Sequence, residues 1–75
     1  MSESRDPNMI TVTINGELHE VPEGLTVAAL LEHLQMVLDR VAIERNLEIL
    51  PKARWQETHV DANDSFEIVH FVGGG

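Results

Sequence analysis

The chain ends in three glycines, Gly73, Gly74 and Gly75, directly after a strand-like run over residues 66–72. Glycine has no Cβ atom, so such a segment adopts positive φ values freely and fits passages too narrow for other residues. This backbone suits a protein whose reactive group is its own terminal carboxylate, presented to another protein. The alternative is a frayed end without function, since termini are commonly disordered. The sequence therefore predicts a flexible tail over residues 73–75, with Gly75 as the candidate reactive residue.

Composition narrows the possible chemistry and partners. The 75 residues include no cysteine, which excludes a side-chain thiol nucleophile, a disulfide and a thiolate zinc site. The net charge is −8, from 13 acidic and 5 basic side chains. Nucleic acids and anionic membranes require clustered Lys and Arg, so we expect neither as a partner. The acidic side chains either favour a basic partner surface or only confer solubility. No apolar run approaches the length of about 18–20 residues that spans a membrane, and we expect a soluble, cytoplasmic protein.

The elements that must position the tail begin with a hairpin. Residues 10–14 alternate Ile and Val with Thr, which is typical of a strand with one buried face. Asn15-Gly16 follows, and this pair favours a type I′ turn because both central positions require positive φ. Residues 17–21 form the returning strand. The two-residue turn predicts the pairs Val12 with His19 and Ile10 with Val21.

A helix follows the hairpin. Thr26 is a plausible N-cap. Behind it one apolar stripe recurs at helical spacing, made of Val27, Leu30, Leu31 and Leu34. We expect this stripe to cover the core.

The second half of the chain has the pattern of short strands. Residues 41–45 and 47–50 are two of them, with a bend at Asn46 and an end at Pro51. Glu44 and Arg45 are expected on a solvated strand face. Residues 52–57 indicate a short helical turn, in which Trp55 is expected as a core anchor rather than a binding platform. After the turn-forming residues 61–64, a last strand begins near Ser65.

This order of elements predicts an α+β protein with the β-grasp architecture, as in ubiquitin. One mixed sheet of four to five strands would carry one helix packed on one face. Residues 9–72 form this domain, and the polar residues 1–8, which include Pro7, form a disordered N-terminal extension.

The last strand is apolar on both faces. Phe66 and Ile68 are expected to face the helix, which leaves Val69 and Phe71 on the uncovered face. An exposed apolar pair next to a mobile tail indicates a partner-binding site, flanked by Thr11 and Thr13. The alternative is that Val69 and Phe71 pack within the monomer.

The order and spacing of several segments resemble the ThiS family of ubiquitin-like sulfur carrier proteins, which act in thiamine biosynthesis. The resemblance covers residues 9–75. The segments that carry it are Val12-Thr13-Ile14-Asn15-Gly16-Glu17, Val21-Pro22-Glu23-Gly24-Leu25-Thr26-Val27, Val41-Ala42-Ile43-Glu44-Arg45-Asn46, Ile49-Leu50-Pro51 with Trp55, and Glu67 to Gly75. Leu47 departs from the family pattern, which usually has a small or polar residue after the asparagine at position 46.

The resemblance implies a carrier rather than an enzyme, with no bound cofactor of its own. An E1-like adenylating enzyme of the ThiF type, using ATP and Mg²⁺, would adenylate the Gly75 carboxylate. A sulfur donor enzyme would supply the sulfur of a thiocarboxylate, which passes to thiazole synthase of the ThiG type. Gly74 would let the reactive carbon reach a buried centre, and Gly73, Val69 and Phe71 would contact the partner.

Three alternatives remain open at this stage. The fold and the Gly-Gly end also fit the small subunit of molybdopterin synthase or another thiocarboxylate carrier. A third possibility, from a different class, is a pure interaction module or a ubiquitin-like modifier that is joined to lysines of target proteins. The four histidines are scattered without ligand spacing, so no metal site is expected.

Overall fold

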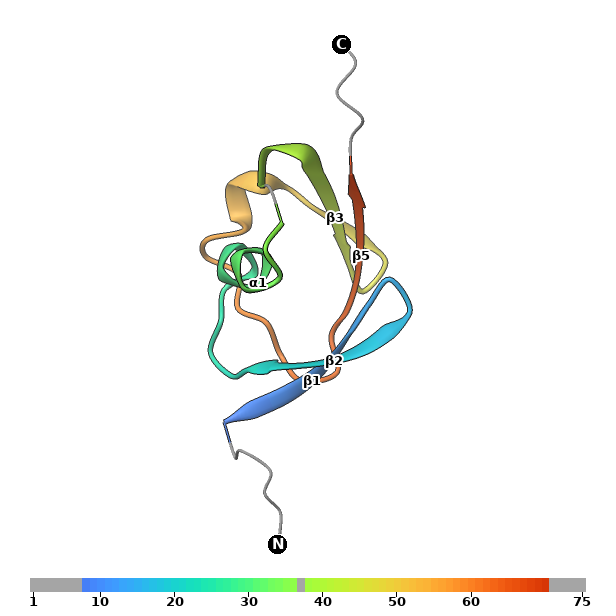
Figure 1. Cartoon of the computed structure of the whole chain (residues 1–75). Coiled ribbons are helices and arrows are strands. Elements are labelled where there is room, and N and C mark those ends of the chain that lie inside the picture. Colours follow the sequence, from blue (N-terminus) through green and yellow to red (C-terminus); the bar gives the residue numbers. More distant parts are fainter. Residues whose placement is uncertain (1–7, 37, 71–75) are drawn as a thin grey trace, which may run out of the picture.

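The computed structural model describes residues 8–36 and 38–70. In these residues five strands form one sheet in the order β2-β1-β5-β3-β4, and helix α1 packs on one face of it (Figure 1). β1 and β5 are parallel, and the other neighbouring pairs are antiparallel. The elements are β1 (Met9–Ile14), β2 (Glu17–Pro22), α1 (Val27–His33), η1 (Leu38–Arg40), β3 (Val41–Arg45), β4 (Glu48–Leu50), η2 (Lys52–Arg54) and β5 (Ser65–His70). The predicted mixed sheet with one helix is confirmed.

The hairpin of β1 and β2 has the predicted register. Ile10 pairs with Val21 and Val12 with His19. Asn15 and Gly16 have φ values of 51° and 85°, as a type I′ turn requires. The predicted extension over residues 1–8 lies outside the described residues except for Asn8, whose carbonyl accepts a hydrogen bond of 2.6 Å from the N–H of Glu23.

Helix α1 is held by its cap and by its apolar stripe. The Thr26 hydroxyl accepts from the N–H of Ala29 at 3.1 Å, which confirms the predicted N-cap. The loop after η2 also satisfies this end of the helix, because Trp55 and Thr58 carbonyls accept from the first N–H groups of α1. Burial of three stripe side chains stabilises the fold by at most about 5–9 kcal/mol; they are Val27, Leu30 and Leu31. Leu34 follows the helix and packs partly buried against the core.

The turn between β3 and β4 differs from the prediction. β4 begins at Glu48 rather than at Leu47. Asn46 and Leu47 have φ values of 52° and 74°, so both form the turn, and Leu47 is 90% exposed. The bend at Asn46 is confirmed, and Leu47 is part of the bend because a two-residue turn needs a second left-handed position.

Strand β5 lies in the centre of the sheet and carries the core. Phe66 and Ile68 are buried, as predicted, and so is Trp55, whose Nε1–H donates to the Leu50 carbonyl at 3.0 Å. Among the described residues no helix is both long and apolar enough to cross a membrane. The core consists of Val12, Ile14, Val21, Val27, Leu30, Leu31, Val41, Ile43, Trp55, Val60, Phe66 and Ile68.

Candidate functional site

The candidate site begins where β5 ends. Phe71, Gly73, Gly74 and Gly75 lie outside the described residues. The strand that leads to them is described as far as His70, and it is held by β1 on one side and β3 on the other (Figure 1). What the structure places at the site is therefore the end of β5 and the neighbouring sheet face that no helix covers, which we call the outer face.

Val69 lies on the outer face, as predicted, and is 58% exposed. Its cross-strand neighbour is Ala42 of β3. The expectation that Thr11 and Thr13 flank it is wrong, because the parallel pairing of β1 with β5 places Thr13 opposite Ser65, at the start of β5.

Next to Val69 and Ala42, the outer face carries a second cross-strand row of side chains, which contains two glutamates. Glu67 of β5 lies opposite Glu44 of β3, and Glu44 lies opposite Ile49 of β4. Ile49 is 77% exposed. Among the described residues no ion pair forms with either glutamate. Two like charges directly opposite each other on a sheet repel, so this pair destabilises the sheet locally.

Asn15 holds the end of β5, a role that its sequence position in a turn did not reveal. Its Oδ1 accepts from the N–H of Ile68 at 2.7 Å, and its Nδ2 donates to the Ile68 carbonyl at 3.2 Å. Its backbone N–H donates to the Phe66 carbonyl at 2.8 Å. The turn between β1 and β2 is therefore attached to the strand that leads to the candidate site.

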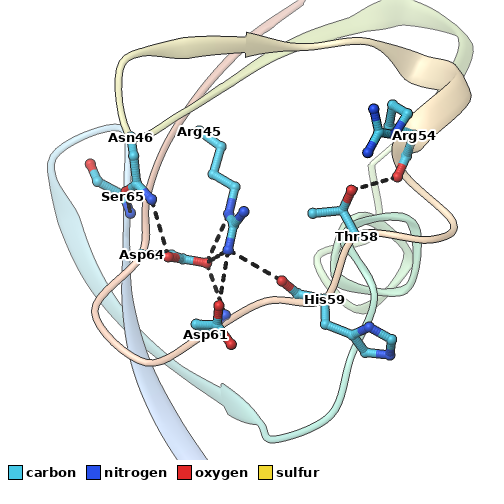
Figure 2. A network of polar contacts seen from close by, with 8 residues as sticks. All are labelled: Arg45, Asn46, Arg54, Thr58, His59, Asp61, Asp64 and Ser65. Atoms are coloured by element: carbon cyan, nitrogen blue, oxygen red, sulfur yellow. Dashed lines mark hydrogen bonds and ion pairs between the residues drawn. The ribbon is translucent and has the colours of Figure 1, made fainter.

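A second unpredicted cluster surrounds Asp64, which is only 6% exposed (Figure 2). Its Oδ2 accepts from Nε and Nη2 of Arg45, at 3.0 and 2.9 Å, and from the N–H of Asp61 at 2.8 Å. Its Oδ1 accepts from Nδ2 of Asn46 at 3.2 Å. The prediction of a solvated face holds for Glu44 and is wrong for Arg45, because pleating turns alternate residues of β3 to opposite faces. The cluster fixes the loop that leads into β5.

The four histidines lie on separate elements. His19, His33, His59 and His70 come from β2, α1, the loop before β5 and the end of β5. The Lys52 ammonium, 2.9 Å from Oδ1 of Asp39, lowers the pKa of that exposed carboxyl below its usual 3.8. This pair lies at η1 and η2, whereas the candidate site is at the end of β5.

Comparisons with known proteins identify the family. Residues 12–75 match the profile of the ThiS family. The chain is 46% identical over 50 residues to the sulfur carrier protein ThiS of Bacillus subtilis, which covers 67% of this chain and 76% of that one. It is 45% identical over 64 residues to a thiazole synthase of Paramagnetospirillum magneticum, 85% of this chain but only 20% of that protein.

A solved structure agrees with the fold. The crystal structure of the thiamine biosynthesis protein ThiS from Geobacter metallireducens superposes with a TM-score of 0.77 at 33% identity, over 88% of this chain and all of that one. The structural match and the family match, which extends through residue 75, lead to the same assignment. The chain belongs to the ThiS family of sulfur carrier proteins.

Proposed function

We propose that this chain carries sulfur on the carbonyl carbon of Gly75 and delivers it for the thiazole ring of thiamine. The observation that carries the proposal is the family match, which runs through Gly75 and includes all three glycines. The similarity to part of a thiazole synthase supports thiazole synthase as the acceptor of the sulfur. In that relative, a region like this chain belongs to the same polypeptide as the synthase.

The proposed chemistry explains why the carrier needs no cysteine. A carboxylate is a poor acyl donor, so an E1-like enzyme of the ThiF type would first activate it, holding ATP and Mg²⁺ itself. A Gly75 carboxylate oxygen attacks the α-phosphorus of ATP, and pyrophosphate leaves. Sulfur at the oxidation level of sulfide, from a sulfur donor enzyme, then attacks the carbonyl carbon. The bond from that carbon to the AMP oxygen breaks, which leaves a C(=O)–S⁻ group.

The described residues would dock the carrier on its activating enzyme. Val69 and Ala42 form an apolar row on the outer face next to the end of β5. Glu44 and Glu67 form the acidic row beside it. We propose that a partner with an apolar centre and basic neighbours covers both rows, and that Phe71 and Gly73 extend the contact. The charge of −8 supports a basic partner surface and faster association at low salt.

The test is the intact mass of the chain after incubation with a ThiF-type enzyme, ATP, Mg²⁺ and sodium sulfide. The proposal expects the mass gain of one oxygen replaced by one sulfur. A matched variant that lacks Gly75 should keep its urea-unfolding midpoint and gain no sulfur. A covalent adduct to a lysine of another protein would instead mark a ubiquitin-like modifier. An unchanged mass of the intact chain with an active enzyme would overturn the proposal.

A further inference from the structure

Two asparagines hold the central strand β5 from opposite sides. Asn15 lies in the β1–β2 turn with φ 51°, and Asn46 lies in the β3–β4 turn with φ 52°. Each donates its backbone N–H to a β5 carbonyl at 2.8 Å, Asn15 to Phe66 and Asn46 to Ser65. Each side-chain Oδ1 accepts from a β5 N–H, from Ile68 at 2.7 Å and from Ser65 at 3.0 Å. The two turns therefore use the same chemistry at different points of one strand.

The difference between them is position along β5. Asn46 binds the first residue of the strand, whereas Asn15 binds near its end. β1 itself pairs with β5 only through Thr13 and Ile14. The carboxamide of Asn15 extends this pairing to Ile68, because it contacts both the N–H and the carbonyl of that residue. In the described part of the chain, no hydrogen bond from the β1 side reaches a residue of β5 after Ile68.

We propose that Asn15 is a positioning residue for activation at Gly75. This inference rests on the proposed function. The carboxamide fixes the end of β5, and the chain to Gly75 continues from there. Without it, β5 would be held by β3 alone from Ile68 onward, through pairs such as Ile43 with Ile68 and Val41 with His70. The activating enzyme would then have to order the end of β5 when it binds the chain.

The size of the effect follows from the cost of ordering the backbone. Restricting the backbone of one residue to a single conformation costs about 1–2 kcal/mol, which corresponds to about a tenfold change in the equilibrium constant for binding the activating enzyme. Asn15→Gly removes the carboxamide and keeps the positive φ, which glycine adopts freely. Asn46→Gly is the matched control, with the same substitution in an equivalent turn at the far end of the same strand.

The experiment measures kcat and KM for pyrophosphate release by a ThiF-type enzyme, with each variant as its substrate. Urea titration at the assay temperature first shows that every variant is fully folded. We expect Asn15→Gly to lower kcat/KM about tenfold and Asn46→Gly to leave it within about twofold. Asn15→Asp keeps an oxygen for the Ile68 N–H and should recover part of the loss. Equal losses in the two glycine variants, or no loss in Asn15→Gly, would overturn the inference.

A second measurement separates this inference from the proposed function. Amide hydrogen exchange of the free chain should quicken at Ile68, whose N–H loses its acceptor, and at Val69 next to it in Asn15→Gly, and it should stay unchanged at both residues in Asn46→Gly. Unchanged exchange in Asn15→Gly overturns the positioning role, whatever the enzyme does. Failure of the wild-type chain to release pyrophosphate with an active enzyme would instead refute the proposed function, and with it the role of Asn15 in activation.

Discussion

Asp64 accepts two hydrogen bonds from the Arg45 guanidinium through one carboxylate oxygen, Oδ2, at 3.0 Å from Nε and 2.9 Å from Nη2. The side chain of Asp64 is 8% exposed and that of Arg45 is 25% exposed, so this pair is largely withdrawn from water. Asp61 also contacts Arg45, at 3.1 Å, but its side chain is 75% exposed. The two aspartates therefore share one arginine in different surroundings.

The first prediction uses this difference. Asp64→Ala should lower the free energy of unfolding by about 2–3 kcal/mol, because it removes charge-assisted hydrogen bonds and leaves Arg45 without its buried partner. Asp61→Ala should lower it by only about 0–1 kcal/mol, since exposed ion pairs contribute little. Urea titration of both variants measures the two losses. Losses of equal size would mean that burial does not distinguish the two carboxylates.

The second prediction concerns Leu47, which adopts φ 74° and is 90% exposed. Leu47→Gly should raise the free energy of unfolding by about 0.5–1 kcal/mol, because relief of the left-handed strain exceeds the entropy that glycine loses on folding. Leu18→Gly is the control. Leu18 is also exposed but lies within β2, where glycine relieves no such strain and should destabilise. Thermal unfolding of the pair should shift in opposite directions, and a loss of stability in Leu47→Gly would contradict the strain argument.

The sequence predicted those features that depend on local chemistry. Asn15-Gly16 determines the turn type, and the turn type determines the pairing of Ile10 with Val21. Thr26 predicts the start of the helix because its hydroxyl satisfies an N–H only three residues away. In both cases the groups that interact are neighbours in the sequence, so their spacing alone is informative.

The unpredicted features depend on contacts between distant segments. In the sequence, Asp64 has the pattern of an ordinary turn residue. Its partners are Arg45, at the end of β3, and Asn46, in the turn that follows, and only the fold places them next to Asp64. Asn15 and Ile68 are 53 positions apart, and they meet because the first and last strands are parallel neighbours. The sequence around an asparagine does not reveal such partners. An asparagine that only forms a turn has the same local pattern as one whose side chain also binds a distant strand.

The third prediction tests the acidic pair on the outer face. Glu67→Gln should raise the free energy of unfolding by about 0.2–1 kcal/mol, because it removes the repulsion from Glu44 on the opposite strand. Glu44→Gln should give a similar gain, and the double variant should gain less than the sum, which is the sign of direct coupling. Glu20→Gln is the control, since Glu20 lies opposite Thr11 and has no like-charged neighbour across the strand. Urea titration at low salt measures all four, and additive gains would show that the two glutamates do not interact.

The last prediction concerns the docking role of Val69. Val69→Ser should weaken binding to a ThiF-type enzyme at least tenfold, or about 1.4 kcal/mol, because it replaces the apolar side chain beside the end of β5 with a polar one. The free energy of unfolding should change by less than about 1 kcal/mol, since Val69 is already 58% exposed. Leu18→Ser is the matched control, because Leu18 is an apolar residue that is 76% exposed but lies on the edge strand β2, two strands away from β5. Calorimetric titration of the enzyme with each variant measures the affinities. If Leu18→Ser weakened binding as much as Val69→Ser, the partner would cover the β2 edge as well, and the proposed apolar row of Val69 and Ala42 would not be the centre of the interface.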